Sequence, residues 1–314
     1  MQSSPGTTLL DLSPEFPYIR SNRIEDRVGS TVLFPIINDM QFQELGNTGI
    51  KVSRLGLGCG GPNRLGLARG ATENDAVRLI ELAVSLGINL IDTAAVYRNE
   101  AIVGRALKKV KREDLVLCSK VPLPKTLPLL TPGSFPERIA REISSLLGRY
   151  LNEDALQRQL FHSLRRLETD YLDVFYLHAV TPAQYPTAIA LLPALLAFKK
   201  SGIIRAIGIT ESTKEDADHF VITQAVQDSR WDVVMLQPPI LDEFKVPDYL
   251  NMARVNNIGV VAMSTISNYP ANPPATYAAV LNIPGITAVL CGTSRASHLR
   301  NNIAAISDSG SVNS

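Results

Sequence analysis

Four polar side chains at the ends of strand-like segments are the residues of this sequence best suited to catalysis. The apolar run Ile88–Ile91 is followed by Asp92 and, after a short loop, by Tyr97. Two further apolar runs, Leu115–Lys120 and Leu172–His178, end on an ammonium group and on an imidazole. If these strands are neighbours in a parallel barrel, the four side chains meet at the rim formed by the strand ends.

The chemistry of this set follows from a phenol lying beside an ammonium group. A free phenol has a pKa of about 10 and donates a proton poorly at neutral pH. We expect Lys120 to lower the pKa of Tyr97 and Asp92 to keep Lys120 charged, while His178 orients a substrate oxygen. Such a set suits a carbonyl that receives a hydride, or an alcohol that loses one. Acyl transfer fits less well, because no Ser–His–Asp spacing accompanies these residues.

Each of the four residues also has a simpler interpretation when it is taken alone. Asp92 is typical of a helix cap, Tyr97 of a surface phenol, Lys120 of a solvated cation and His178 of a core histidine. The catalytic interpretation depends on their shared position at strand ends. Metal-dependent hydrolysis fits poorly, since the remaining histidines fall on helical segments: His162, His219 and His298.

Length, charge and cysteine content restrict the class of protein. The chain has 314 residues with 31 basic and 30 acidic side chains, for a net charge of +1, so bulk charge attracts neither nucleic acid nor an anionic membrane. No apolar run approaches the roughly 20 residues that span a bilayer, and the N-terminus lacks the pattern of a signal peptide. We expect a cytoplasmic protein in which Cys59, Cys118 and Cys291 are buried, reduced thiols.

The chain divides by composition into three parts. Residues 1–39 are rich in Ser, Pro, Thr and Gly, and we expect an extension that is partly disordered or packed on the rest of the chain. Residues 40–306 carry a regular pattern that opens with a predicted β-hairpin, 42–52, around a turn rich in Gly and Asn. Residues 307–314 form a polar tail.

Strand and helix signals alternate after the hairpin. The strand segments are Leu55–Gly58, Ile88–Asp92, Leu115–Lys120, Leu172–His178, Ala206–Thr210, Val233–Gln237, Gly259–Met263 and Ile286–Cys291. The helical segments are Glu73–Leu86, Ala101–Lys109, Asp154–Leu167, Pro186–Lys200, Lys214–Gln227, Pro247–Asn256, Thr276–Leu281 and Ser297–Ile306. Strands that are each followed by a helix predict a (β/α)8 TIM barrel. A doubly wound sheet is the alternative, but its glycine-rich turn at 55–61 leads into Pro62–Arg64, a poor helix start.

The loop after the third strand is longer than such a barrel requires. Residues 121–150 are first rich in Pro and Leu and then amphipathic. A long loop at the active rim is typical of a lid or a substrate wall. The equal alternative is a peripheral insertion that packs its apolar face on the barrel.

From about Met40 to Ile306 the sequence resembles the aldo-keto reductases. Residues 92–97, Asp-Thr-Ala-Ala-Val-Tyr, are similar to that family's D-T-A-x-x-Y motif. Residues 163–178 are similar to its S-L-x-x-L…Y-x-D…H block, and residues 202–209 to its G-x-I-R-x-I-G-V segment. The resemblance implies a barrel that binds NADPH without a Rossmann fold. It also implies that Tyr97 is the proton donor, that Lys120 and Asp92 tune it, and that His178 places the carbonyl.

The resemblance also implies a set of cofactor-binding residues. It places Gly58, Cys59 and Gly60 in the first cofactor loop and Gln237 at the nicotinamide carboxamide. The segment Gly292, Thr293, Ser294 and Arg295 corresponds to the adenosine-phosphate site. A helix N-terminus, two hydroxyls and an arginine suit a 2′-phosphate, so we expect NADPH rather than NADH. A simple capped, charged helix start is the alternative interpretation of this segment.

Several positions depart from the family pattern. A Ser-Asn pair is replaced by Thr210 and Glu211, and the aromatic residue that stacks on the nicotinamide is replaced by Met263, followed by Ser264. In the last helix His298 and Asn301 stand where Gln or Arg and Glu are common, while Asn302 is as expected. We expect the long C-terminal loop of many members to be absent here, with 121–150 or the N-terminal extension as a candidate replacement.

The sequence therefore predicts an NADPH-dependent carbonyl reductase, or an alcohol or aldose dehydrogenase in the reverse direction. Its partner is a small carbonyl or alcohol, and the altered rim suits a bulky substrate of specialised metabolism. The alternative, from another class, is a nucleotide-binding regulatory or scaffold subunit with little turnover, as in potassium-channel beta subunits of this fold.

Overall fold

The computed structural model describes residues 40–123, 152–238, 246–268 and 272–309. The predicted extension 1–39 and nearly all of the predicted long loop lie outside the described residues. The loop begins later than expected, because β5 (Val116–Pro122) continues past Lys120. The predicted tail also begins later, since α11 (Ala296–Ser309) continues to Ser309.

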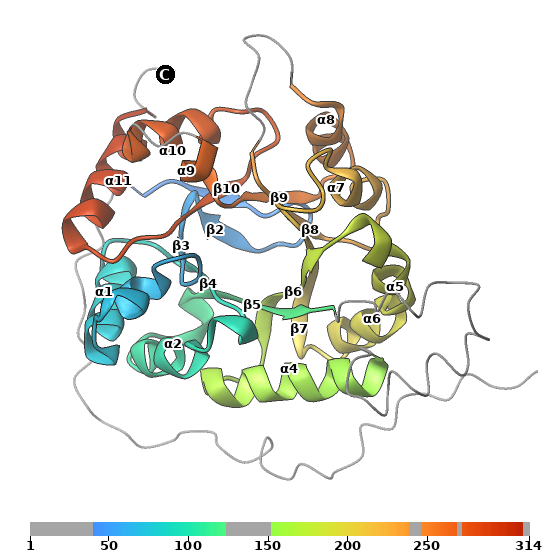
Figure 1. Cartoon of the computed structure of the whole chain (residues 1–314), viewed down its shortest axis with the longest axis horizontal. Coiled ribbons are helices and arrows are strands. Elements are labelled where there is room, and N and C mark those ends of the chain that lie inside the picture. The colour runs from blue at the N-terminus through green and yellow to red at the C-terminus, as the bar shows by residue number, and fades with distance from the viewer. Residues whose placement is uncertain (1–39, 124–151, 239–245, 269–271, 310–314) are drawn as a thin grey trace, which may run out of the picture. The chain divides into compact units, whose positions relative to one another are not determined.

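Eight parallel strands close into a barrel with helices around it, which confirms the predicted fold (Figure 1). The barrel strands are β3 (Leu55–Gly58), β4 (Leu90–Asp92), β5, β6 (Leu172–Val180), β7 (Ile204–Glu211), β8 (Val233–Leu236), β9 (Gly259–Ala262) and β10 (Ala288–Cys291). Neighbours along the chain are neighbours in the barrel, and β10 pairs with β3 to close it. Each strand overlaps a segment that the apolar runs predicted, as is typical of strands buried on both faces.

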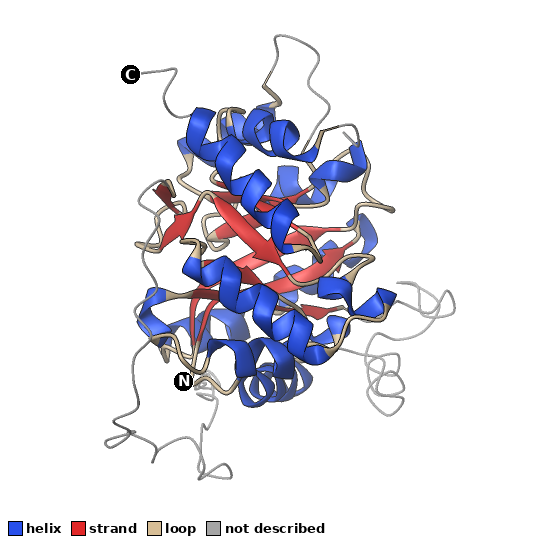
Figure 2. Ribbon diagram, turned by 90° about the vertical axis from the view of Figure 1, so that its left-hand side faces the viewer, coloured by secondary structure: helices blue, strands red, loops and turns tan. Residues whose placement is uncertain are grey.

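The helices lie outside the ring of strands (Figure 2). They are α1 (Glu73–Ser85), α2 (Glu100–Leu107), α4 (Glu153–Leu167), α5 (Tyr185–Ala190), α6 (Leu192–Lys200), α7 (Phe220–Ala225), α8 (Asp248–Val255), α9 (Thr265–Asn268), α10 (Pro273–Leu281) and α11. A capping box begins α1, because Thr72 and Asp75 each bond the other's backbone N–H. A helical face of α1 packs on the strands through Ala76, Leu79 and Ile80.

Two predicted helices differ from the observed ones. The segment predicted as a single helix, 186–200, is divided at Leu191, because Pro193 has no N–H to continue the helical hydrogen bonds. The helix predicted at 214–227 begins only at Phe220. The carboxylate of Asp216 accepts hydrogen bonds from the N–H groups of Phe220 and Val221, which fixes the start of α7 there.

Buried apolar side chains form two separate layers. One layer lies between the strands and the helices, and the other lies inside the barrel. The interior layer includes Leu90, Val174 and Val261, with the side chains of Leu45 and Ile50 from the hairpin β1 (Phe42–Glu44) and β2 (Lys51–Ser53). The hairpin, which confirms another prediction, lies at the amino ends of the strands, where the N–H of Asn47 bonds the carbonyl of Asn257 ahead of β9. It closes that end of the barrel.

The described residues contain no helix long and apolar enough to cross a membrane. All three cysteines are buried, as predicted.

Candidate active site

Asp92 and Lys120 form a buried ion pair at the carboxyl ends of β4 and β5. The Lys120 Nζ lies 2.5 Å from each carboxylate oxygen of Asp92 and donates to the carbonyl of Thr93 at 3.0 Å. The side chain of Lys120 is 1% exposed and that of Asp92 is 5% exposed. Burial by itself lowers the pKa of Lys120, but its interactions with Asp92 and Tyr97 outweigh burial and raise that pKa. Lys120 is therefore held as an ammonium ion.

Tyr97 is brought to this pair by a short turn after β4. It ends a 3-10 helix, η2 (Ala95–Tyr97), and Arg98 then takes a left-handed backbone with φ of 58°. The Tyr97 ring lies against Gly60, where a Cβ atom would overlap the ring, so this position requires glycine. The ring centroid is 5.4 Å from the Lys120 Nζ. The structure thus brings Asp92, Tyr97 and Lys120 together, as the sequence predicted.

His178 completes the set from β6. Its Nε2 lies 3.4 Å from the Tyr97 hydroxyl, and the two rings meet edge to face with centroids 5.6 Å apart. The β6–β7 register shifts beyond Leu177, and Ala179 has a φ of 51°. The N–H of Ala179 donates to Thr210 Oγ1 at 2.7 Å. Thr210 thus holds the irregularity that directs His178 toward Tyr97.

The protonation states differ in one respect from the sequence-based expectation. Burial raises the pKa of Tyr97 and outweighs the opposing effect of Lys120. The predicted lowering of this pKa is therefore wrong for the protein without a bound ligand, because desolvation of a phenolate costs more than the ammonium returns. Burial also lowers the pKa of His178 to about 3. At neutral pH the site presents a protonated phenol and a neutral imidazole.

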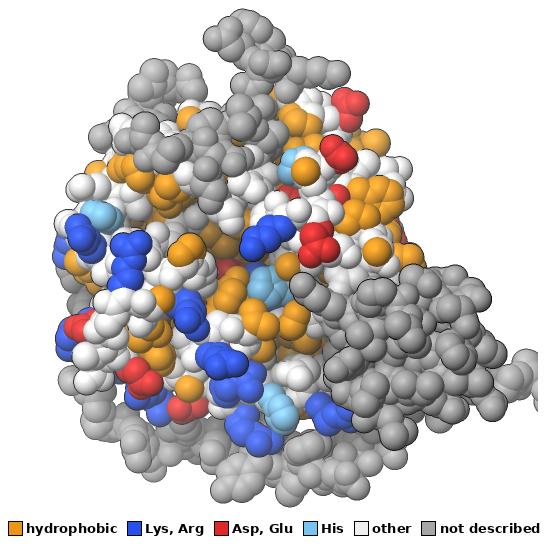
Figure 3. Space-filling view, in the orientation of Figure 1, with side chains coloured by type: hydrophobic (Ala, Val, Ile, Leu, Met, Phe, Trp, Pro, Cys, Tyr) orange, Lys and Arg blue, Asp and Glu red, His pale blue; other side chains and the backbone are white. Residues whose placement is uncertain are grey.

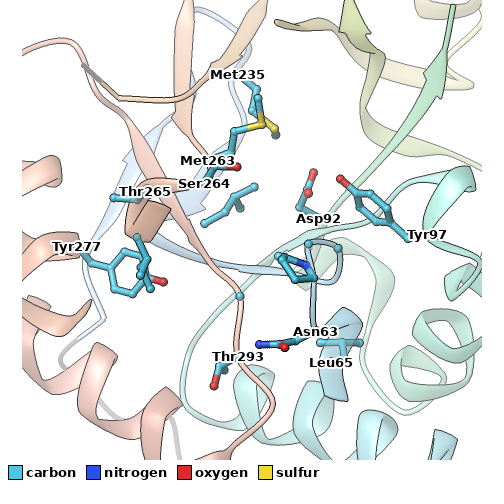
Figure 4. Close-up of a pocket in the computed structure, with 17 residues that line it drawn as sticks. Asn63, Leu65, Asp92, Tyr97, Met235, Met263, Ser264, Thr265, Tyr277 and Thr293 are labelled. Atoms are coloured by element: carbon cyan, nitrogen blue, oxygen red, sulfur yellow. The ribbon is translucent and has the colours of Figure 1, made fainter. Parts of the chain in front are cut away.

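A cavity of about 210 Å³ opens beside Tyr97 and Asp92. Figure 4 shows these two residues on one side, with Thr265 and Tyr277 on the other and Asn63 and Thr293 between the two sides. The lining residues come mainly from the segments after β3, β9 and β10. They are Gly58, Gly60, Gly61, Pro62, Asn63, Leu65, Asp92, Tyr97, Met235, Met263, Ser264, Thr265, Ile266, Tyr277, Leu290, Gly292 and Thr293.

The polar atoms of this cavity fit an elongated polar ligand. The Oδ1 of Asn63 and the Oγ1 of Thr265 are buried and have no hydrogen-bond partner among the described residues. Leaving such atoms unpaired costs about 1–3 kcal/mol each. Met235 and Met263 supply an apolar wall that can pack on a planar ring. A nucleotide with a nicotinamide ring has both kinds of group.

Six of the residues predicted to bind the cofactor line the cavity. They are Gly58, Gly60, Met263, Ser264, Gly292 and Thr293. The side chain of Cys59 is instead fully buried in the layer beneath the helices, and Thr210 bonds Ala179. Glu211, the last residue of β7, and Gln237, directly after β8, are not among the lining residues, and the two oxygens of Glu211 already accept hydrogen bonds. For Cys59, Thr210 and Glu211 the structure gives no direct side-chain contact with the cavity.

The remaining predicted residues lie at the start of α11. Ser294, Arg295 and His298 are exposed, and the N–H of Arg295 donates to Thr293 Oγ1 at 3.2 Å. Asn302 is buried, with its side chain against the thiol of Cys291.

Several lining residues were not predicted from the sequence. Met235 and Leu290 are inward-facing strand residues, so the alternation along β8 and β10 carries a signal for them. Asn63 and Leu65 lie around a left-handed turn of η1 (Arg64–Arg69), where Leu65 has a φ of 59°. Tyr277 lies on α10, and nothing in the sequence distinguishes it from a core residue.

The fold and the site together define a class of protein. It is a (β/α)8 barrel with a phenol, an ammonium and an imidazole beside a cavity that is lined by both polar and apolar residues. The chain belongs to the Aldo/keto reductase family, whose model matches residues 54–269.

Two curated relatives support the same assignment. The chain is 33% identical over 235 residues to an NADH-specific methylglyoxal reductase of Escherichia coli, covering 71% of this chain and 66% of that protein. It is 26% identical over 309 residues to an L-galactose dehydrogenase of Arabidopsis thaliana, covering 86% and 89%. In fold it is similar to the holo form of an aldo-keto reductase from Bacillus halodurans, with a TM-score of 0.65, 23% identity, and coverage of 85% and 91%.

The extent of these matches differs between relatives. The matched part spans 66% of the Escherichia coli protein and 50% of the aldo-keto reductase YhdN of Bacillus subtilis. The chain thus spans less than two thirds of these curated relatives.

Proposed function

We propose that the protein is an NADPH-dependent oxidoreductase that interconverts a carbonyl compound and an alcohol. The observation that carries the proposal is the placement of the Tyr97 hydroxyl, 3.4 Å from His178 Nε2, at the edge of the cavity described above. The names of two relatives, a methylglyoxal reductase and an L-galactose dehydrogenase, agree with carbonyl reduction and with its reverse.

Each of the four polar residues has a separate role in the proposed reaction. A bound nicotinamide supplies or accepts the hydride at the substrate carbon. For reduction, Tyr97 donates its hydroxyl proton to the substrate oxygen, and Lys120 stabilises the phenolate that remains. The neutral His178 contacts the same oxygen and orients it. Asp92 keeps Lys120 charged and in place.

The cofactor preference is a part of this proposal. Arg295 is exposed at the start of α11, next to Thr293 of the cavity. A guanidinium at a helix N-terminus favours the 2′-phosphate of NADPH. The Escherichia coli relative is NADH-specific by name, so this preference needs its own measurement. We further propose a cytoplasmic enzyme with its catalytic domain at 40–306 and, as its substrate, a bulky carbonyl compound of low molecular mass.

The first experiment compares binding and turnover. NADPH and NADH are titrated by fluorescence against the wild type, Arg295→Ala and, as a matched control on the same helix, Arg300→Ala. We expect only Arg295→Ala to weaken NADPH binding. Turnover of a carbonyl panel is followed by loss of NADPH absorbance, and Tyr97→Phe is expected to lower kcat by about 10²–10⁴-fold.

Two results would contradict the proposal. Binding of neither nucleotide would reject the cofactor assignment. Tight binding with no turnover of any carbonyl, large or small, would favour a regulatory subunit that retains nucleotide without catalysis.

A further inference from the structure

A buried carboxylate at the end of β7 has no place in the reaction described above. Glu211 is 1% exposed. Burying a carboxylate is costly unless it is paired and hydrogen-bonded. The groups that contact the Glu211 carboxylate therefore indicate its role.

The carboxylate of Glu211 joins two segments at the carboxyl end of the barrel. Its Oε1 accepts the backbone N–H of Gln237, directly after β8, at 2.8 Å. Its Oε2 lies 2.7 Å from His219 Nδ1, ahead of α7. One carboxylate thus fixes the backbone of Gln237 to an imidazole from another loop.

The conformation of His219 is unusual and is maintained by its surroundings. Its φ is 55°, in the left-handed region that costs a non-glycine residue free energy. The hydrogen bonds of Asp216 to the N–H groups of Phe220 and Val221 hold the next turn in place. The imidazole ring also packs at 5.0 Å between centroids against the ring of Tyr249 on α8. Loop and helix together hold this imidazole against Glu211.

We propose that the buried Glu211 and the partly buried His219 form an ion pair that positions Gln237 for the carboxamide of the nicotinamide ring. This inference rests on the proposed function, since Gln237 is assigned to the carboxamide only there. Glu211 does not act on the cofactor by direct contact. It acts through the backbone of Gln237. Glu211 and His219 are positioning residues.

The charges around His219 favour its protonated form. The groups that face it are Glu211 on β7, Asp216 and Asp218 in its own loop, and Tyr249 on α8. Burial lowers the pKa of His219, but the hydrogen bond and charge of Glu211, with the two aspartates, raise it above the ordinary value of 6.5. In Figure 3 acidic side chains gather on the part of this face over α7 and α8. As pH rises through the raised pKa, His219 loses its charge and Glu211 loses its counterion.

The ion pair is tested without catalysis by following the four histidine side chains by NMR across pH. The signal of His219 is identified by its loss in His219→Asn. We expect its pKa to lie above 6.5 in the wild type and to fall below 6.5 in Glu211→Gln, which keeps the shape but removes the charge. Asp218→Asn, an exposed neighbour, is the control and should lower the pKa less. An unchanged pKa in Glu211→Gln would overturn the ion pair.

The positioning role is tested by NADPH binding on the same proteins. Loss of a charge-assisted hydrogen bond predicts a Kd about tenfold higher or more in Glu211→Gln, with Asp218→Asn unchanged. In the wild type Kd should rise as pH passes the NMR-determined pKa of His219, and it should be flat in Glu211→Gln. Should Glu211→Gln fail to fold, His219→Asn replaces it, because Asn tolerates the left-handed backbone and keeps a neutral donor.

The outcomes separate this inference from the proposed function. Wild-type protein that binds neither nucleotide contradicts the proposed function, whatever the NMR titration gives. Wild-type binding with the same Kd and pH profile in Glu211→Gln contradicts the positioning role alone.

Discussion

His178 makes the stability of this protein depend on pH. Burial lowers its pKa from 6.5 to about 3, so in mildly acid solution the unfolded chain takes up a proton that the folded chain does not. Stability from this residue is therefore present above pH 6.5 and is lost as pH falls toward 3. Between pH 7 and pH 5 the loss is about 2 kcal/mol. Urea unfolding at the two pH values measures it.

The matched variant is His178→Gln, which has no charge to gain. Its free energy of unfolding should fall by about 2 kcal/mol less than that of the wild type over the same interval. Equal pH dependence in the two proteins would mean that His178 is already solvated in the folded chain.

The Asp92–Lys120 pair makes a second prediction at this scale. Lys120→Met removes the only partner that the structure gives the carboxylate oxygens of Asp92 among the described residues. A buried charge left alone costs about 3–5 kcal/mol, measured as a lower free energy of unfolding. Adding Asp92→Asn should restore part of that loss. If the single and the double variant are equally unstable, the pair is not coupled in this way.

Individual residues also separate what the sequence can predict about the site from what it cannot. The meeting of Asp92, Tyr97, Lys120 and His178 was predictable, because strand order in a parallel barrel places these four residues together. The direction of the Tyr97 pKa was not, since it depends on the depth of burial. The orientation of Glu211 was not predictable either, since its side chain turns from the cavity toward Gln237 and His219.

At the scale of elements, Gly104 controls how closely α2 approaches the end of α4. A Cβ atom there would lie 2.8 Å from the carbonyl oxygens of Arg166 and Leu167. Alanine favours a helix by about 1 kcal/mol over glycine, but displacing backbone in a packed core costs about 1–3 kcal/mol. We therefore expect Gly104→Ala to lower the midpoint of thermal unfolding. Arg105→Ala, at the exposed next position, is the control, and a stabilised Gly104→Ala would show that the two helices can separate freely.

Elements were predictable where a long periodic or apolar run specified them. All eight barrel strands and the hairpin coincide with predicted segments. The failures are local. The division of α5 from α6 and the late start of α7 depend on Pro193 and on the side chain of Asp216. Their effects come from single bonds rather than from the pattern of a whole segment.

The whole molecule separates stability from chemistry along the barrel axis. The hairpin closes the amino ends of the strands with Leu45 and Ile50, whereas Tyr97 and the cavity lie at the carboxyl ends. Ile50 is 1% exposed, so Ile50→Ala should lower the free energy of unfolding by about 2–5 kcal/mol. It should leave kcat and cofactor Kd at 25 °C unchanged, because no cavity residue moves.

The matched truncation at the other end is Ile266→Ala in the cavity wall. There we expect a weaker Kd with a smaller loss of stability, since Ile266 is only half-buried. A change of Kd in Ile50→Ala as large as that in Ile266→Ala would mean that the two ends of the barrel are coupled, and that the hairpin also tunes the active rim.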